Sequence, residues 1–195
     1  PQWLRVFDDQ IALDDQPDLL VDVTRFRRLL ASVAAHRHAS LAVCNACVLA
    51  LADAADIAAS PFLAGFALPD APEFDLWQSM QADSLHRELG DVLEQLAIVH
   101  AGAGRNAVRT AIDYAHRGLA LDPLHEPAHR LLMVLFAEAG DRAAALQQFD
   151  ECSRVLAAEL DAEPSPETIE LRDRIVAGDV RSAVEALYPP AQVDG

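Results

Sequence analysis

The run His125-Glu126-Pro127-Ala128-His129 has the spacing of a zinc-hydrolase motif. On one helix, two imidazoles four residues apart would share a face and bind zinc, with the glutamate as general base. Proline is tolerated only in the first turn of a helix, so Pro127 predicts a helix that begins near Glu126 and leaves His125 outside it. The two histidines then do not share a face. We therefore interpret the motif as the entry turn of a helix, with a zinc metallohydrolase as the disfavoured alternative.

A second group with metal-ligand chemistry is His36 and His38, followed by Cys44 and Cys47. Cys-x-x-Cys is a spacing found in zinc sites and in redox-active thiol pairs. These cysteines lie in an apolar, alanine-rich run of helical character, where a free cysteine behaves as a small buried hydrophobe. We favour packing for both cysteines, and we predict no metal, no cofactor and no catalytic residue.

Helical patterns occupy most of the chain and would position these residues. Asp22 is placed to cap the first helix, which the stretch His36–Ser40 interrupts. Asp70-Ala71-Pro72-Glu73 predicts another helix start, with Asp70 as the cap and Pro72 in the first turn. Turns containing glycine or proline separate the later helices. After the first helix, the predicted helices cover residues 41–59, 70–100, 106–121, 127–139, 142–160, 166–177 and 180–187.

Two other segments have distinct patterns. Residues 3–13 alternate as two short strands around an acidic turn and predict a β-hairpin. A lone hairpin is marginal in water, so it must pack on the rest of the chain or on a preceding segment. The aromatic side chains of Phe62, Phe66, Phe74 and Trp77 are predicted to form core between the front helices and the later ones.

An internal repeat sharpens the prediction of the fold. Ala111, Ala115 and Gly118 recur at a spacing of 34 residues as Ala145, Phe149 and Cys152. A more divergent third copy contains Gly178, Ala183 and Leu187. This period, in antiparallel helix pairs, resembles the tetratricopeptide pattern. We predict an all-α fold, a tetratricopeptide-like α-solenoid of antiparallel helix pairs preceded by the hairpin.

Four blocks resemble the bacterial transcriptional activation domain of SARP/AfsR-type regulators. The similarity covers about residues 20–178, and the block that begins at Phe62 is the most specific. The blocks are Phe62-Leu63-Ala64-Gly65-Phe66-Ala67-Leu68-Pro69-Asp70-Ala71-Pro72-Glu73-Phe74-Asp75-Leu76-Trp77, residues 119–133, residues 139–146 and residues 159–168.

The resemblance implies a regulatory domain without enzymatic activity. In that family a winged helix-turn-helix DNA-binding domain precedes an all-α region, which mediates self-association and contacts with transcription machinery or with sensor and ATPase domains. Residues 1–16 would be similar to the terminal hairpin of the DNA-binding domain, and Val21–Phe26 would mark the junction. Pro1 indicates a fragment of a longer chain. The expected divisions are a hairpin over residues 1–20, linking helices over 21–69 and helical repeats over 70–195.

Composition bears on the partners. The chain of 195 residues has a formal charge of −16, and all its 15 basic residues are arginine. A chain this acidic is repelled by polyanions, which disfavours nucleic acid and membrane surfaces as partners of this segment. We predict a cytoplasmic protein that binds other proteins, such as RNA polymerase subunits, a second copy or adjacent regulatory domains, with DNA contacted only through an upstream domain.

The alternative to this protein-interaction function is a ligand-sensing helical-repeat domain. The candidate interaction residues, on first helices of the repeat pairs, are Arg130, Val134, Glu138 and Arg172.

Overall fold

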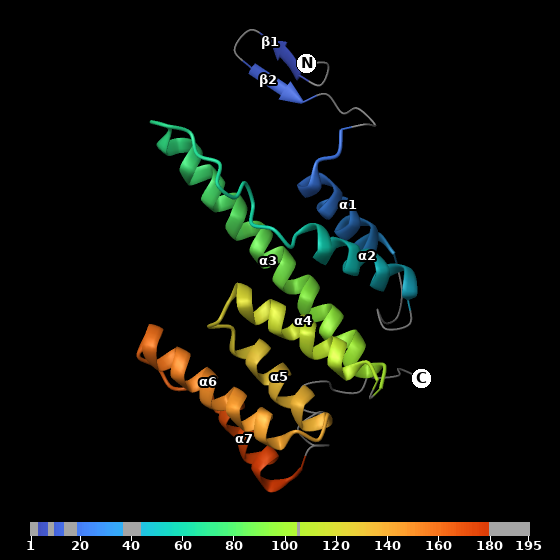
Figure 1. The fold of residues 1–195 in the computed structure, drawn as a ribbon, viewed down its shortest axis with the longest axis vertical. Coiled ribbons are helices and arrows are strands. Elements are labelled where there is room, and N and C mark those ends of the chain that lie inside the picture. Colours follow the sequence, from blue (N-terminus) through green and yellow to red (C-terminus); the bar gives the residue numbers. More distant parts are fainter. Residues whose placement is uncertain (1–3, 8–9, 14–18, 37–43, 105, 180–195) are drawn as a thin grey trace.

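The computed structural model describes residues 4–7, 10–13, 19–36, 44–104 and 106–179. Two strands, β1 (Leu4–Phe7) and β2 (Gln10–Leu13), form an antiparallel pair in which Leu4 lies opposite Leu13. The predicted hairpin is therefore confirmed. It lies apart from the helices at one end of the molecule (Figure 1), and the side chains of Leu4, Val6 and Phe7 are exposed.

Two helices, α1 (Asp22–Ala35) and α2 (Asn45–Ile57), pack against each other and against the third helix. Arg27 of α1 also links to the third helix through a paired contact with the Glu88 carboxylate, 2.9 Å at the closer oxygen. The predicted cap at Asp22 is wrong. Val21 is the N-cap, and Asp22 occupies the first helical position, where its charge still favours the positive end of the helix dipole.

The third helix, α3 (Pro72–Gly102), is 31 residues long and extends beyond the others (Figure 1). Pro72 opens it as predicted, but Ala71 is the N-cap and Asp70 has a left-handed backbone with φ of 55°. Every buried residue of α3 lies in its second half, from Leu89 onward. The connector before α3 runs along its first half and is held there by a hydrogen bond from Gln78 to the Leu63 carbonyl, while Leu85 packs against the core formed with α1 and α2.

Four shorter helices complete the stack: α4 (Val108–Leu121), α5 (Glu126–Glu138), α6 (Arg142–Leu160) and α7 (Pro166–Ala177). The bounds of α6 and α7 agree with the prediction. A residue with positive φ follows each of the helices α5, α6 and α7 and marks where that helix ends. Gly140 has φ of 84°, Asp161 has φ of 51°, and Gly178 has φ of 80°. The predicted helix over 180–187, with the third repeat copy at Ala183 and Leu187, lies outside the described residues.

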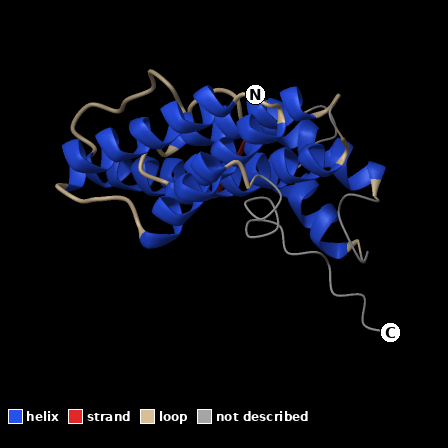
Figure 2. Cartoon of the chain, turned by 90° about the horizontal axis from the view of Figure 1, so that it is seen from below, coloured by secondary structure: helices blue, strands red, loops and turns tan. Residues whose placement is uncertain are grey.

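The apolar interior is divided among three clusters that follow one another along the stack. The first joins α1, α2 and α3 around Phe26 and Leu93, and the second joins α3, α4 and α5 around Leu132. The third joins α5, α6 and α7 around Met133 and Ile175. In the view of Figure 2 the described chain is almost wholly helical, with loops at the helix ends. Helices packing on their neighbours in this way form an all-α helical-repeat fold, as predicted.

The predicted aromatic core is the main error in the fold. Phe62, Phe66, Phe74 and Trp77 do contact one another, with ring centroids 5.5 to 5.8 Å apart. However, they lie on the projecting half of α3 and its connector, and Phe66 and Trp77 remain about half exposed, so they do not form a core between the front helices and the later ones. We call this region the α3 apolar surface and define it by its exposed members, Leu63, Phe66, Leu68, Leu76, Trp77 and Met80.

Candidate functional site

The zinc-hydrolase spacing at residues 125–129 is divided by the start of α5. His125 is the N-cap, as the position of Pro127 predicted, and its side chain does not belong to the helical face that carries His129. His129 is 1% exposed. The motif thus places one histidine at a turn and the other in the interior.

Both ring nitrogens of His129 are occupied by hydrogen bonds. Nε2 lies 2.9 Å from the carbonyl oxygen of Pro123, and that oxygen can only accept, so Nε2 donates. Nδ1 lies 2.7 Å from the side-chain nitrogen of Gln148 on α6 and accepts from it. A metal would have to displace one of these bonds. The imidazole instead ties α5 to α6 and to the turn before α5.

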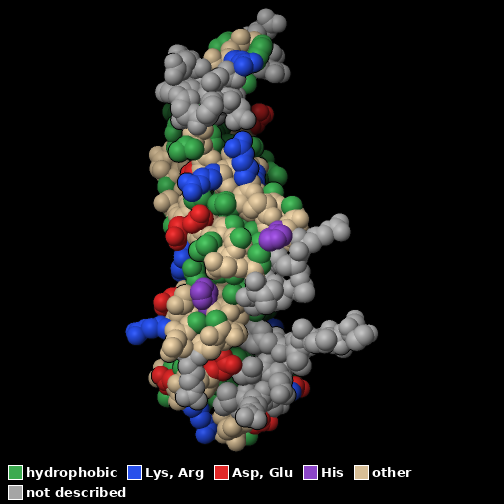
Figure 3. All heavy atoms as spheres, turned by 90° about the vertical axis from the view of Figure 1, so that its right-hand side faces the viewer, with side chains coloured by type: hydrophobic (Ala, Val, Ile, Leu, Met, Phe, Trp, Pro, Cys, Tyr) green, Lys and Arg blue, Asp and Glu red, His purple; other side chains and the backbone are tan. Residues whose placement is uncertain are grey.

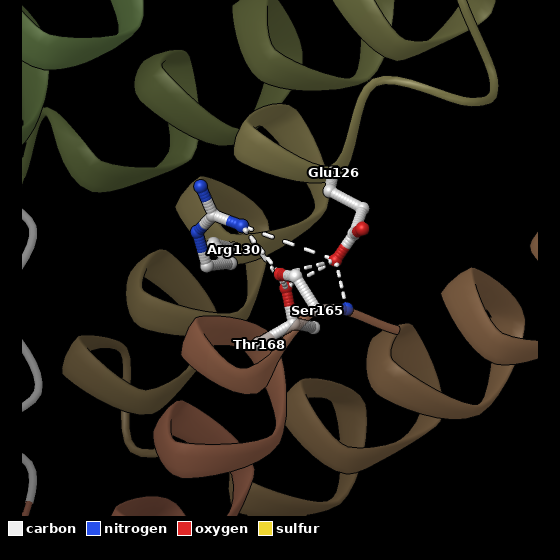
Figure 4. A network of polar contacts seen from close by, with 4 residues as sticks. All are labelled: Glu126, Arg130, Ser165 and Thr168. Atoms are coloured by element: carbon white, nitrogen blue, oxygen red, sulfur yellow. Dashed lines mark hydrogen bonds and ion pairs between the residues drawn. The ribbon is translucent and has the colours of Figure 1, made fainter. Parts of the chain in front are cut away.

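Glu126, the glutamate of the same motif, is engaged just as fully (Figure 4). Its Oε2 atom accepts hydrogen bonds from the Ser165 backbone nitrogen at 2.9 Å, the Ser165 hydroxyl at 2.8 Å and the Thr168 hydroxyl at 2.6 Å. Arg130 donates to Thr168 at 3.0 Å and lies 3.9 Å from the same carboxylate. This network joins the first turn of α5 to the first turn of α7.

The electrostatics of Glu126 agree with a structural role. Burial on its own would raise the pKa of the carboxyl, but hydrogen bonds from Thr168 and Ser165, with the charge of Arg130, outweigh burial and lower that pKa. A general base working near neutral pH needs the opposite shift. Glu126 and His129 of the motif therefore hold neighbouring helices together through hydrogen bonds to α6 and to the start of α7.

The four candidate interaction residues fall in different environments. Arg130 belongs to the network just described, and Arg172 pairs with Asp173 and lies over the Phe149 ring at 4.8 Å. Glu138 is half-buried, and burial raises the pKa of its carboxyl. Val134 requires a correction: it is 0% exposed within the third core cluster, because the face of α5 that carries it packs on α6 and α7.

His36, Cys44 and Cys47 meet where α1 ends and α2 begins. The Nδ1 atom of His36 lies 3.1 Å from the Cys47 sulfur and 3.3 Å from the Cys44 sulfur. The start of the helix predicted over 41–59 lies outside the described residues; within them α2 begins at Asn45, and Cys44 is its half-buried, non-helical N-cap. Cys47 is buried, and burial, then a hydrogen bond with Cys44, raises the pKa of its thiol. His38 lies outside the described residues.

A groove of about 550 Å³, which no sequence pattern indicated, runs between α3 and α5 along α4. Its apolar lining includes Ala128 and Leu131 of α5, and Gly118 of α4 also lines it. Four carboxylates and one guanidinium also line it. These charged groups are Asp83, Asp91, Glu94, Asp122 and Arg87. The volume is in the range of small-molecule sites, and the charge favours a cationic ligand.

Surface charge was predicted to disfavour nucleic acid. On the described part of the face in Figure 3, cationic, acidic and hydrophobic side chains are interspersed, and the cations do not form a continuous stripe. A basic patch or stripe is the usual electrostatic footprint of a nucleic-acid interface. Of the helices in the described part of the chain, none combines the length and apolar character that a bilayer span requires.

These features define the class of protein: an all-α helical-repeat domain whose buried polar clusters hold its repeats together and whose apolar surface lies on a projecting helix. The chain belongs to the bacterial transcriptional activator domain family, which it matches over residues 21–176. That family is one of transcription regulation and not of enzymes. The resemblance inferred from the sequence blocks is thereby confirmed.

A curated relative supports the same assignment. The chain is 39% identical over 80 residues to the regulatory protein AfsR of Streptomyces griseus, a SARP-type regulator. The aligned stretch covers 41% of this chain and 8% of AfsR, so the chain corresponds to a small part of that protein. Together, the two comparisons show that the chain is a transcriptional activator domain of SARP-type regulators.

Proposed function

We propose that this domain is the protein-interaction module through which a bacterial SARP/AfsR-like regulator acts on DNA-templated transcription. It would contact the transcription machinery, a second copy of itself, or sensor and ATPase domains of the same regulator, in the cytoplasm. DNA would be contacted by an upstream domain to which the β1–β2 hairpin belongs. The observation that carries this proposal is the α3 apolar surface.

The α3 apolar surface has the composition of a protein interface. Leu76 is 64% exposed, Met80 61%, Phe66 51% and Trp77 46%. Contiguous apolar patches rimmed by polar residues mark interaction sites, and tryptophan and methionine are enriched in interface cores. Trp77 is braced by Phe62 at 5.8 Å, so little side-chain freedom remains to be lost on binding.

The rim of this surface indicates the chemistry of the partner. Asp70, Glu73 and Asp75 are exposed beside the aromatic side chains, and the whole chain carries a charge of −16. Complementary charge at a rim accelerates association and selects partners. The fitting partner is therefore a protein surface with an apolar centre and arginine or lysine around it.

The experiment compares a double variant of this surface, Trp77→Ala with Met80→Ala, with a matched control. Leu160→Ala with Val176→Ala also removes two exposed apolar side chains, but from α6 and α7. Binding of purified RNA polymerase and of the regulator's neighbouring domains is measured by pull-down, and self-association by light scattering. We expect the first variant to lose binding to one of these three partners at least about tenfold, since interface anchors cost more than about 1 kcal/mol. Equal binding by both variants and the unmodified protein would show that the α3 apolar surface is not the interaction site for these partners.

The groove between α3 and α5 favours one alternative, a ligand-sensing domain for a cationic peptide or small molecule. A ligand that binds only the folded state raises the thermal midpoint, by the equivalent of about 2.7 kcal/mol at 100 times its Kd. Gly90 lines the groove, and no atom lies within 4 Å of a Cβ added there. A shift that disappears in Gly90→Leu would support sensing through this groove, and a shift that survives in this variant would place the ligand elsewhere.

A further inference from the structure

The adjoining ends of α1 and α2 bring three metal-ligating side chains together. His36 is the C-cap of α1, Cys44 is the N-cap of α2, and Cys47 follows in the first turn of α2. The three ligand atoms all lie within 4.8 Å of one another. Within the described ranges, no other group of three histidine, cysteine or acidic side chains is placed to hold a metal ion.

We propose that His36, Cys44 and Cys47 bind one zinc ion. Two thiolates and an imidazole are a donor set that zinc prefers over the harder divalent cations. Tetrahedral zinc, with bonds of about 2.3 Å to sulfur and about 2.05 Å to nitrogen, separates nitrogen from sulfur by roughly 3.6 Å. The observed separations of 3.1 and 3.3 Å need to open by only a few tenths of an ångström.

The local fold explains why the two sulfurs converge. Cys44 and Cys47 lie three residues apart at the start of α2, and both sulfurs turn toward the same His36 nitrogen at the end of α1. The backbone N–H groups at the start of α2 also favour negative charge on both sulfurs. Cys47 is buried, Cys44 is half-buried and His36 is exposed, so the ion would lie at the edge of the protein. Its fourth position is then open to water.

The bound ion would have a structural effect on the front of the domain. It would link α1 to α2 at the end of the hairpin they form, beside the core cluster that contains Phe26 and Leu51. Metal binding that needs the folded arrangement stabilises the fold. Zinc would therefore stabilise the packing of these two helices, independently of which partner the α3 apolar surface binds.

Two other states of the same residues are outcomes of the test. One is a hydrogen-bonded trio without affinity for metal. The other is a disulfide between Cys44 and Cys47, which forms only if an external oxidant accepts two electrons as both thiols lose their protons. Metal content and free-thiol titration distinguish these two states from a zinc site.

The test measures zinc in the full 195-residue chain by mass spectrometry after reduction, incubation with zinc chloride and exhaustive dialysis. We expect one zinc per chain. Replacement by cobalt should give the intense thiolate-to-cobalt absorption and the visible bands of a tetrahedral site. His36→Ala should weaken zinc binding at least about 100-fold, because losing even an outer partner of a metal ligand costs about 10–100-fold. This variant alters an exposed side chain, so its folding is the least at risk.

Matched controls separate the site from other ligands of the same types. His86→Ala removes another exposed histidine and Cys152→Ala removes the third cysteine, and both should retain one zinc and the cobalt spectrum. A chelator should lower the thermal midpoint of the unmodified protein but not that of His36→Ala. Absence of bound metal, a disulfide that persists after reduction, or unchanged zinc in the triple variant His36→Ala, Cys44→Ser and Cys47→Ser would overturn the proposal.

Discussion

The Oε2 atom of Glu126 lies 2.6 Å from the hydroxyl oxygen of Thr168, 42 residues further along the chain. Thr168 is completely buried, and the same carboxylate also accepts two bonds from Ser165. One glutamate therefore accepts hydrogen bonds from three donors at the start of α7, the Ser165 backbone N–H and the two hydroxyl groups. A side chain that resembled a catalytic base in the sequence is a connection between two repeats.

Removing that carboxylate should destabilise the domain. Glu126→Ala leaves the Thr168 hydroxyl and the Ser165 backbone N–H without their acceptor. We expect a loss of about 1–3 kcal/mol in the free energy of unfolding, measured in urea. Glu167→Ala removes an exposed carboxylate from the same turn of α7 and should change stability by less than about 0.5 kcal/mol. Similar losses in the two variants would contradict the role assigned to Glu126.

The two histidines of the motif should behave differently. His129→Ala removes both hydrogen bonds of a buried ring and leaves Gln148 unpaired, which should cost about 2–4 kcal/mol. His125→Ala alters a turn and should cost less than about 0.5 kcal/mol. Thermal unfolding of the two variants measures the difference. A zinc pair would instead make both variants lose the same metal-dependent stability.

Glu138 should limit stability at neutral pH. Its Oε2 atom is buried and has no hydrogen-bond partner among the described residues, and burial raises the pKa of the carboxyl. A raised pKa in the folded state means that this contribution to stability is fully present below the unfolded pKa and is lost as the pH rises through the folded pKa. Glu138→Gln should therefore stabilise the domain at pH 7, by about 0.5–2 kcal/mol, with a smaller gain in acid.

Glu126 should show the opposite pH dependence. Its pKa is lowered in the folded state, so its contribution is present above the unfolded pKa and is lost as the pH falls through the folded value. Unfolding curves collected from pH 7 into acid should show the cost of Glu126→Ala shrinking as the pH falls. A cost that stays constant down to the lowest pH would show that the charge of Glu126 is not what stabilises the network.

Two glycines should respond to alanine with opposite signs. Gly140 ends the turn between α5 and α6 with φ of 84°, where a side chain costs about 1–2 kcal/mol. Gly90 lies inside α3, where no atom is within 4 Å of an added Cβ, and alanine there should stabilise by about 0.5–1 kcal/mol. Chemical denaturation of both variants tests the sign, and a stabilised Gly140→Ala would contradict the assigned turn.

Sequence patterns predicted those features of the fold that are set by residues close together in the chain, such as helix ends. The bounds of α6 and α7 followed from the turns at Gly140 and Glu163-Pro164, which act locally. Cys44 was predicted to be helical but is the N-cap of α2, because an alanine-rich run favours helix at every position and gives no signal for a boundary. The carboxylate network could not be predicted, since its partners are 39 and 42 residues apart.

The exposed aromatic side chains were misassigned for a related reason. An apolar residue type states a preference for burial but does not reveal whether the chain provides a neighbour to cover it. Phe66 and Trp77 pack on other aromatic side chains, yet both remain about half exposed. Only the path of α3 beyond the other helices shows this.

The order of the three core clusters along the chain allows the domain to fold stepwise while it is being translated. Each is completed by helices that are consecutive in the chain, so a nascent domain can bury its first cluster once α3 and α4 have left the ribosome, before α5 to α7 exist. Each later helix then adds to a surface that is already formed. The bonds from Ser165 and Thr168 to Glu126 come late in this order, and they close the domain when α7 arrives.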